Sequence, residues 1–423
     1  MSQFAGYRCA RCGQTYGPDE QFYVCPNCGA NLDVILDVEW IAAASSPATI
    51  GQSPDFSIWR YLPLLPVDDP GHHGTPLRSV GWTPLYGAPR LRQALGLDRL
   101  WVKDDGRNPT ASFKDRASAV VVARAQALGV ERVVTASTGN AGAALAGMAA
   151  AAGMPSVIFA PKTAPPAKVA QLMIYGADVY LVEGNYDQAF DLTIEAAQTY
   201  GWYCRNTGYN PFTAEGKKTA AFEICEQLTL AESGKLADGE RWLAPDAIFV
   251  SVGDGNIISG LAKGFQDLLD LGWIEAAPRL YGVQSEGSAA IYNAYQRGVD
   301  EIEPVSATTL ADSISVDFPR DGWRALQAAR NSGGAYLQVS DQDILEAISH
   351  LALTAGVFAE PAGAAAHAGL RQAAAKEMLG PDERVVLLNT GNGIKDVASA
   401  MKAAGEPTVI EPTLAALAAV MEA

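Results

Sequence analysis

Apolar and polar positions along the chain form two alternating patterns. Short runs rich in β-branched residues, typical of buried strands, lie at residues 100–103, 132–135, 156–160, 178–182, 247–252, 279–284, 335–339 and 384–388. Alanine-rich segments with helical periodicity lie between many of them, at residues 115–128, 140–152, 165–175, 186–200, 256–269 and 341–355. This alternation indicates parallel sheets that helices cover on both faces, so the predicted fold class is α/β.

The amino-terminal region follows neither pattern. Cys9 and Cys12 form one Cys-x-x-Cys pair, and Cys25 and Cys28 form a second. Each pair makes a tight turn that can aim two thiolates at one ion, and two such turns complete a tetrahedral shell of four sulfurs. We therefore predict a small structural zinc ribbon at residues 1–38, with iron in the same shell or two disulfides as the alternatives.

The next segment, residues 37–89, is rich in Pro, Trp and Gly, and we expect it to be irregular and to wrap a larger body. His72 and His73 in this segment are interpreted as surface loop residues. Cys204 and Cys225 stand apart from the other cysteines and are interpreted as buried small hydrophobic residues.

Composition limits the classes of function. The 423 residues are 48% hydrophobic, which is ordinary for a globular protein of two or three domains. The net charge of −16 argues against binding to nucleic acid or anionic membranes, and any anionic substrate must be met by locally placed cations. The longest apolar run, residues 141–155, is too short to cross a bilayer, and residues 1–11 do not resemble a secretion signal. We therefore expect a cytoplasmic protein.

Three glycine-rich stretches follow predicted strands, at the edge where parallel sheets bind ligands. Residues 137–142 offer hydroxyls, a carboxamide and amides for a carboxylate or a ring hydroxyl, although a capped turn alone explains them better. In residues 252–257 two glycines allow backbone amides to surround a phosphate, so Asp254 must point outward, bind water or a cation, or hydrogen-bond the loop itself. Residues 388–393 present Thr390, whose hydroxyl can bond a neutral ring nitrogen.

Lys114 lies between a polar turn at residues 108–113 and the apolar helix predicted from residue 115. An ammonium group in such a partly dry site has a lowered pKa and becomes an amine nucleophile, as a Schiff-base lysine requires. A solvated lysine in the first helical turn is the alternative. One reactive amine, one phosphate-binding loop and one hydroxyl suit a phosphorylated aromatic aldehyde, namely pyridoxal phosphate.

Four stretches resemble motifs of threonine synthases, namely residues 109–116, 137–142, 210–219 and 389–391. The resemblance runs from about residue 81 to residue 396 and is specific for the fold type II group of pyridoxal phosphate enzymes, which is similar to tryptophan synthase β. Some threonine synthase relatives also carry a cysteine ribbon. The resemblance implies two α/β domains with parallel sheets after the ribbon, within a catalytic region at residues 39–423. A smaller, mobile subdomain is expected roughly at residues 116–209, and the larger subdomain is the rest.

The resemblance also implies a role for each matching position. Lys114 holds the cofactor as an imine and moves protons at the substrate's Cα and Cβ. Asn140 bonds the ring hydroxyl, and Thr390 faces the ring nitrogen. The substrate carboxylate is held by Ser137, Thr138 and Gly139. The cofactor phosphate is held by the loop of Gly253, Asp254, Gly255, Asn256 and Ile257.

In the reaction that the resemblance implies, a lyase of threonine biosynthesis converts O-phosphohomoserine and water into threonine and phosphate. The chain departs from the family pattern at several positions. Ala111 and Ala117 replace glycines, and Asp254 stands where the family has Asn. Thr213 stands where the family has an arginine that clamps the substrate phosphate. The cations that could substitute for it, or could equally be solvated surface charges, are Arg205, Lys162, Lys168 and Lys217.

Three hypotheses remain open. The first is a threonine synthase. The second is a relative that performs β-replacement or β-elimination on O-phosphoserine, serine or threonine, such as a cysteate-synthase-like enzyme or a deaminase. The third is a non-catalytic relative in which the ribbon contacts partners. The expected ligand is a small phosphorylated or hydroxylated amino acid. Residues 407–423 have helical periodicity and are expected to pack on the body or on a second subunit of a homodimer.

Overall fold

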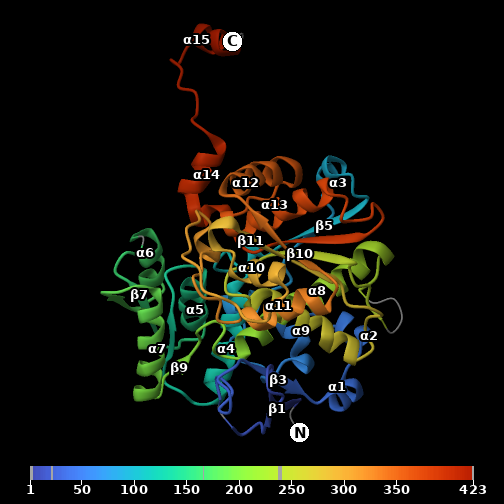
Figure 1. Cartoon of the computed structure of the whole chain (residues 1–423), viewed down its shortest axis with the longest axis vertical. Coiled ribbons are helices and arrows are strands. Elements are labelled where there is room, and N and C mark those ends of the chain that lie inside the picture. The colour runs from blue at the N-terminus through green and yellow to red at the C-terminus, as the bar shows by residue number, and fades with distance from the viewer. Residues whose placement is uncertain (1–2, 21, 165, 237–240, 422–423) are drawn as a thin grey trace.

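The computed structural model describes residues 3–20, 22–164, 166–236 and 241–421. Residues 1–2, where the expected ribbon begins, and residue 165, where one predicted helix begins, lie outside the described residues. Strands in the described part form three sheets, one antiparallel and two largely parallel. Figure 1 shows the antiparallel sheet (blue) at the base of a larger α/β body. The predicted fold class is confirmed.

The larger sheet has the strand order β12 (Ala335–Val339), β11 (Arg279–Ser285), β10 (Ala247–Ser251), β13 (Arg384–Asn389), β5 (Arg99–Asp104) and β4 (Leu85–Tyr86). All neighbours pair in parallel except β4, which runs antiparallel to β5 at the edge. The strands predicted for this sheet are confirmed. Their continuous apolar runs are typical of strands in a sheet that is buried on both faces.

Helices cover both faces of this sheet. On one face, Ile248 and Val250 pack against α8 (Phe212–Ser233), α9 (Asn256–Asp270), α10 (Ala290–Arg297) and α11 (Gly322–Asn331). On the other face, Ala247 and Phe249 pack against α3 (Pro89–Leu95), α12 (Asp341–Ala355) and α13 (Pro361–Ala375). Successive side chains of β10 therefore belong to different hydrophobic clusters, as strand geometry requires.

The smaller sheet has the strand order β8 (Asp178–Val182), β7 (Ser156–Pro161), β6 (Val133–Ala136) and β9 (Tyr203–Cys204), all in parallel. Along β7, Val157 and Phe159 pack toward α7 (Tyr186–Tyr200), whereas Ile158 packs toward α5 (Asn140–Ala151) and α6 (Pro166–Ile174). Helix α4 (Lys114–Ala127) contacts both α5 and α8 and so connects the two sheets. The short strand β9 was not predicted, because two residues carry no periodic signal.

The antiparallel sheet of β1 (Phe4–Cys9), β2 (Thr15–Tyr16) and β3 (Leu32–Leu36) packs on the body. The rings of Phe4 and Tyr7 make edge contacts with Phe212, the first residue of α8. Asp33 forms an ion pair with Arg324 of α11. The ribbon is thus attached to the helical layer that covers the larger sheet.

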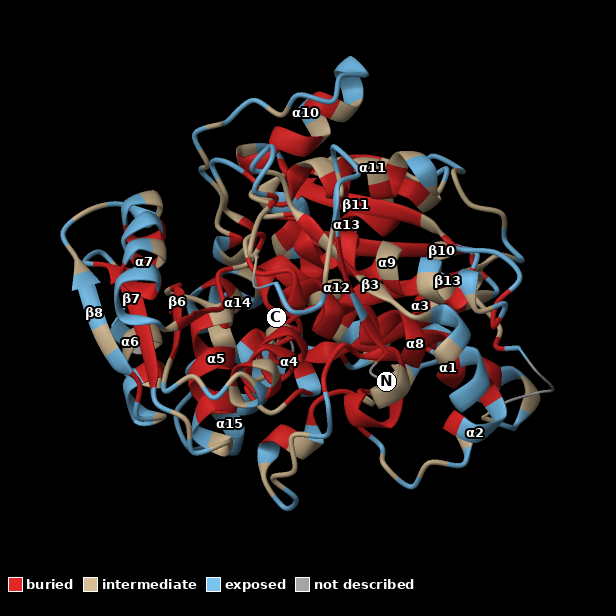
Figure 2. Ribbon diagram, turned by 90° about the horizontal axis from the view of Figure 1, so that it is seen from below, coloured by how far each residue is buried: buried red, intermediate tan, exposed pale blue. Residues whose placement is uncertain are grey.

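Helix α8 was not predicted, although it is 22 residues long. It is buried around most of its circumference (Figure 2), so it has no polar stripe of the kind that marks a surface helix. Helices α10, α11 and α13 were also not predicted. No helix in the described part of the chain combines the length and the apolar character needed to span a membrane.

The segment at residues 37–89 is more regular than expected. It contains α1 (Val38–Ala44), α2 (Pro47–Gly51) and the 3-10 helices η1 (Ile58–Leu64) and η2 (Pro76–Ser79). The side chains of Asp37 and Ser46 cap α1 and α2 by accepting hydrogen bonds from amides of the first turn. These caps are local sequence signals, and the expectation of an irregular segment overlooked them.

The carboxy-terminal segment does not pack on the body. Helix α14 (Val397–Ala404) contacts α12, but α15 (Leu414–Met421) has no buried residue and lies away from the other helices (Figure 1). Residues 405–413 form no helix or strand, and Pro407 and Pro412 disfavour one. Packing of this segment on a second subunit stays a prediction.

A network of buried charges connects α4, α8 and β5. Glu223 accepts hydrogen bonds from Lys103 (2.7 Å) and from two nitrogens of Arg116 (2.6 and 2.7 Å). Arg116 also donates to Asp105 at 2.5 and 2.9 Å, and all four side chains are fully buried. Burial by itself raises the pKa of Glu223, but the charges of Arg116 and Lys103 outweigh it and hold the pKa at about 2.

We predict that Glu223→Gln lowers the free energy of unfolding at pH 7 by about 3–5 kcal/mol, because Lys103 loses its carboxylate partner and Arg116 keeps only Asp105. The pKa of Glu223 is lower in the folded chain than the unfolded value of about 4.3, so its stabilising contribution is present above that value and disappears as the pH falls through about 2. In denaturant titrations the difference between wild type and variant should therefore shrink from about pH 5 to about pH 2.

The exposed pair of Glu183 and Lys162 provides the control, and Glu183→Gln should leave the unfolding free energy unchanged. A difference between wild type and Glu223→Gln that stays constant over the acidic range would contradict the depressed pKa.

Candidate active site

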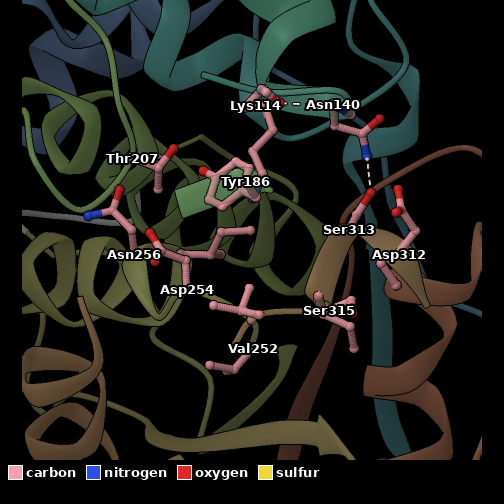
Figure 3. A pocket seen from close by; sticks show the side chains of 18 of the residues that line it. Lys114, Asn140, Tyr186, Thr207, Val252, Asp254, Asn256, Asp312, Ser313 and Ser315 are labelled. Carbon is pink, nitrogen blue, oxygen red and sulfur yellow. Dashed lines mark hydrogen bonds between the residues drawn. The ribbon is translucent and has the colours of Figure 1, made fainter. Parts of the chain in front are cut away.

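One cavity of about 390 Å³ lies beyond the carboxyl ends of β6, β10 and β13, where parallel sheets bind ligands (Figure 3). Each position that the sequence analysis assigned to the cofactor or the substrate lines this cavity, namely Lys114, Ser137, Thr138, Gly139, Asn140, Gly253, Asp254, Gly255, Asn256, Ile257 and Thr390. The structure therefore brings these residues together. Their individual roles stay predictions.

Lys114 is the first residue of α4, and the loop after β13 holds the turn before it. The Phe113 amide donates to the Thr390 carbonyl (2.9 Å), and the Asn392 amide donates to the Ala111 carbonyl (3.0 Å). Backbone bonds on both sides of the turn thus position the lysine beside the end of β13.

The surroundings of Lys114 change its acidity. Burial and the charge of Arg205 lower the pKa of Lys114 to about 8, although the carboxylates of Asp254 and Glu360 oppose the shift. An amine with this pKa is partly unprotonated near neutral pH and can act as a nucleophile or a base. Its side chain points into the cavity (Figure 3), so the alternative of a solvated surface lysine does not describe it.

The two alanines that replace family glycines are accommodated in different ways. Ala111 has a left-handed backbone with φ of 64°, a conformation that costs a non-glycine residue about 1–2 kcal/mol. Ala117 is buried where α4 meets α8, and there Gly216 permits the close approach. A Cβ on Gly216 would lie 2.1 Å from the Arg116 carbonyl oxygen.

The loop at residues 253–257 runs from β10 to α9 and packs against a neighbouring loop. A Cβ on Gly253 would lie 2.8 Å from Ile314 Cα. A Cβ on Gly255, whose φ is 96°, would lie 2.7 Å from the Asp321 carbonyl oxygen. Both positions therefore require glycine, and the loop offers the cavity backbone rather than side-chain bulk, as a phosphate site at a helix amino end needs.

Asp254 does not point outward. Its Oδ1 accepts a hydrogen bond from the Arg320 amide (2.6 Å), whereas its Oδ2 is buried and has no hydrogen-bond partner among the described residues. Burial raises the pKa of Asp254 to about 6. Of the three alternatives that the sequence left open, an outward orientation and a hydrogen bond within the loop itself are wrong, because the partner lies on a neighbouring loop. Binding of water or a cation stays a prediction.

Asn140, the first residue of α5, is held from the other side of the cavity. Its Nδ2 donates to Glu360 Oε1 (2.6 Å) and to Ser313 Oγ (3.3 Å), the second of which Figure 3 shows. Burial raises the pKa of Glu360 to about 7. Sequence reasoning missed both partners, since a Glu-Pro pair at the start of α13 signals a helix start and not a site.

The cations considered as replacements for an arginine at residue 213 lie in different surroundings. Lys162 and Lys168 form ion pairs with exposed carboxylates. Lys217 and Arg205 are fully buried, and Lys217 lines the cavity. Burial lowers the pKa of Arg205 to about 10, and burial with the charge of Lys114 holds the pKa of Lys217 well below its usual range.

The four cysteines of the ribbon meet at one point. Their sulfur atoms all lie within 4.8 Å of one another. The Sγ atoms of Cys9 and Cys28 are 3.5 Å apart, and those of Cys12 and Cys25 are 3.7 Å apart. These cysteines are free, so the disulfide alternative is wrong. The separations match the edge of about 3.8 Å of a tetrahedron with metal–sulfur bonds of about 2.3 Å.

Comparison with known proteins identifies relatives over most of the chain. Residues 77–391 match the family described as pyridoxal-phosphate dependent enzyme. The threonine synthase of Methanocaldococcus jannaschii is 39% identical over 406 residues, which cover 96% of each chain. The threonine synthase of Methanosarcina acetivorans is 37% identical over 97% of each chain. Among solved structures, the processed form of threonine deaminase isoform 2 from Solanum lycopersicum has a TM-score of 0.65, with 22% identity over 82% of this chain and 92% of that chain.

We predict that chemical modification of Lys114 in the cofactor-free protein follows its lowered pKa. The rate of reaction with trinitrobenzenesulfonate, measured by mass spectrometry of the Lys114 peptide, should rise with pH through a midpoint of about 8. The same peptide in the unfolded chain is the control, with a midpoint of about 10.4. A midpoint above about 10 in the folded protein would show that burial does not perturb this amine.

Proposed function

We propose that this chain, which belongs to the family of pyridoxal-phosphate dependent enzymes, is a threonine synthase that converts O-phosphohomoserine and water into threonine and phosphate. The observation that carries the proposal is the common cavity of Lys114, the glycine loop at residues 253–257 and Thr390. The identity of 37–39% with threonine synthases along nearly the whole chain supports this activity over others in the family.

The residues of the cavity fit pyridoxal phosphate. The amine of Lys114, with a pKa of about 8, suits reaction with an aldehyde. Gly253 and Gly255 let the loop pack closely against residues 314 and 321, where a Cβ would clash, and the loop leads into the amino end of α9, where backbone amides attract a phosphate group. When bound, pyridoxal phosphate supplies an electron sink that makes the protons on the substrate's Cα and Cβ acidic.

We assign the other roles from position. Asn140 would bond the ring hydroxyl, and the hydroxyl of Thr390 would face the ring nitrogen. The turn of Ser137, Thr138 and Gly139 precedes the amino end of α5, where amides and hydroxyls attract a carboxylate. Lys114 would move protons at the substrate's Cα and Cβ, because its pKa lies close to neutral pH.

We further propose that the chain comprises a ribbon at residues 1–38 and a catalytic region at residues 39–423, in which a subdomain at about residues 116–209 moves over the substrate. Asn140 and Glu360, on opposite walls of the cavity, are hydrogen-bonded. Arg320 and Asp187 form a second contact of this kind. Closure of these walls would exclude bulk water until the step in which one water molecule is added at Cβ.

The ribbon cysteines fit a structural Zn²⁺ ion, since four sulfurs at tetrahedral separations leave no position for a substrate. The expected cytoplasmic location and homodimer stay predictions.

We predict that Lys114→Ala lowers turnover by a factor on the order of 10⁴ or more, because the variant loses the amine that would act as both anchor and base. The measurement is phosphate release from O-phosphohomoserine, beside ketoacid formation from serine and threonine and sulfonate formation from O-phosphoserine with sulfite. Lys162→Ala, at an exposed residue, is the control. Ketoacid formation from serine or threonine would indicate a deaminase, and sulfonate formation from O-phosphoserine and sulfite would indicate a cysteate-synthase-like enzyme, if no phosphate is released from O-phosphohomoserine. Turnover that survives Lys114→Ala would overturn the assignment.

We predict that Cys12→Ser harms stability more than chemistry. The metal content should fall from about one zinc per chain to nearly none, and the melting temperature should fall, because ligand loss removes metal binding from the folding free energy. Elemental analysis also distinguishes zinc from iron. Cys225→Ala, at a buried cysteine outside the ribbon, should leave the metal content unchanged. Unaltered zinc content in Cys12→Ser would exclude the four-cysteine site.

A further inference from the structure

Buried cations in this protein fall into two groups. Seven arginine and lysine side chains in the described part of the chain are buried, namely Arg60, Lys103, Arg116, Arg205, Lys217, Lys218 and Arg324. Five of them form ion pairs with a carboxylate. Arg205 and Lys217 have no described carboxylate within ion-pair distance, although burial of an unpaired charge is costly.

The amino group of Lys217 has only a neutral partner. It donates to Asn256 Oδ1 at 2.5 Å, and Thr213, one turn earlier on α8, donates to the same oxygen at 3.1 Å. Asn256 Nδ2 donates to Asp321 (2.6 Å), which fixes the orientation of the amide. The charge of Asp321 is itself paired with Arg324.

The guanidinium group of Arg205 is also incompletely satisfied. Its Nε donates to Ser118 Oγ at 3.2 Å, and its Nη1 donates to Thr207. Its Nη2 is buried and has no hydrogen-bond partner in the residues described. Thr207 lines the cavity, so this arginine stands directly behind the wall.

The negative charge that faces these cations is small. The acidic residue on this wall is Asp254. One of its carboxylate oxygens is buried without a hydrogen-bond partner among the described residues, and the other accepts a hydrogen bond from the Arg320 amide. Figure 3 shows Asp254, Thr207 and Asn256 near one another, and Asn140 and Ser313 on the opposite side of the cavity. An anion in the cavity would lie beside both basic groups and would raise the lowered pKa of Lys217, so this wall favours a further anion.

We propose that Lys217 binds the phosphate ester of the substrate, supported by the charge of Arg205 behind the cavity wall, at a position next to the amide loop that we assign to the cofactor phosphate. This inference rests on the proposed function. The loop at residues 253–257 can hold one phosphate through neutral amides at a helix amino end. A second phosphate dianion in the same cavity needs cationic partners to offset repulsion from the first, and these two side chains supply them.

The arrangement also determines specificity. An amino acid with a hydroxyl in place of the phosphate ester would leave both buried cations unpaired, and such a mismatch discriminates strongly against a ligand. The chain should therefore select phosphorylated substrates without an arginine at residue 213.

The test compares wild-type holoenzyme with Lys217→Gln. Loss of one charge-assisted hydrogen bond should raise the KM for O-phosphohomoserine and the inhibition constant of inorganic phosphate roughly tenfold to a hundredfold. The dissociation constants of pyridoxal phosphate and of threonine, which lacks a phosphate, should stay within about twofold. Lys217→Arg keeps the charge and should recover most of the phosphate affinity, which a merely structural role would not explain.

The neighbouring residue offers a matched control. Lys218 is equally buried but forms ion pairs with Glu215 and Asp267. Lys218→Gln should therefore lower the melting temperature and leave both phosphate-dependent constants unchanged. Arg205→Gln is the second variant, and it should raise the same two constants if Lys217→Gln does not fold.

Two results would overturn the inference. One is an unchanged inhibition constant for inorganic phosphate in both folded variants. The other is a loss of pyridoxal phosphate affinity by the same factor, because the cations would then serve the cofactor phosphate. If wild-type enzyme releases no phosphate from O-phosphohomoserine, the proposed function fails by itself. In that case the melting temperature of the holoenzyme with inorganic phosphate still tests the second phosphate position. A rise in wild type that is lost in Lys217→Gln would support this position, and no rise in wild type would refute it.

Discussion

The backbone pairing between residues 111–113 and residues 390–392 is the contact on which the site depends. Ser112 and Gly391 form an isolated antiparallel bridge, with amide bonds on either side of it. This pairing holds the start of α4 at the carboxyl end of β13, which lies beside β10 in the larger sheet. The position of Lys114 is therefore set by main-chain bonds, so its amino group is left for chemistry.

The buried charged side chains of helix α8 have different partners on different sides of the helix. Toward β5 and α4, Glu223 is matched by Lys103 and Arg116. Toward α9, Lys218 is matched by carboxylates. Successive residues of a helix are rotated by about 100°, so Lys217 faces the cavity instead and meets only an amide oxygen there. Ion pairs are complete where the helix packs on protein, and positive charge is unbalanced where it faces the ligand space.

The departures from the family motifs become consistent when they are viewed together. Thr213 carries no charge, but Lys217 lies four residues later on the same face of α8, and both donate to Asn256. A group that a bound anion would protonate thus lies on the wall of the cavity at a different residue. Asp254, in the loop that we assign to the cofactor phosphate, is bound to a neighbouring backbone amide and has a raised pKa, which limits its repulsion of an anion.

Local sequence patterns and long-range packing determine different features of this protein. Periodicity, Cys-x-x-Cys spacing and glycine-rich turns by themselves determined the α/β class, the strands of the two larger sheets except the two-residue β4 and β9, the cysteine cluster and the loops that line the cavity, because each depends on residues close together in the chain. Helix α8 escaped prediction, since burial on all sides removes the amphipathic signal. Only the tertiary structure decided which buried charges have partners. Lys217 meets Asn256 across 39 residues and Asp254 meets Arg320 across 66, and such pairings depend on how helices and loops pack against one another and not on any local pattern.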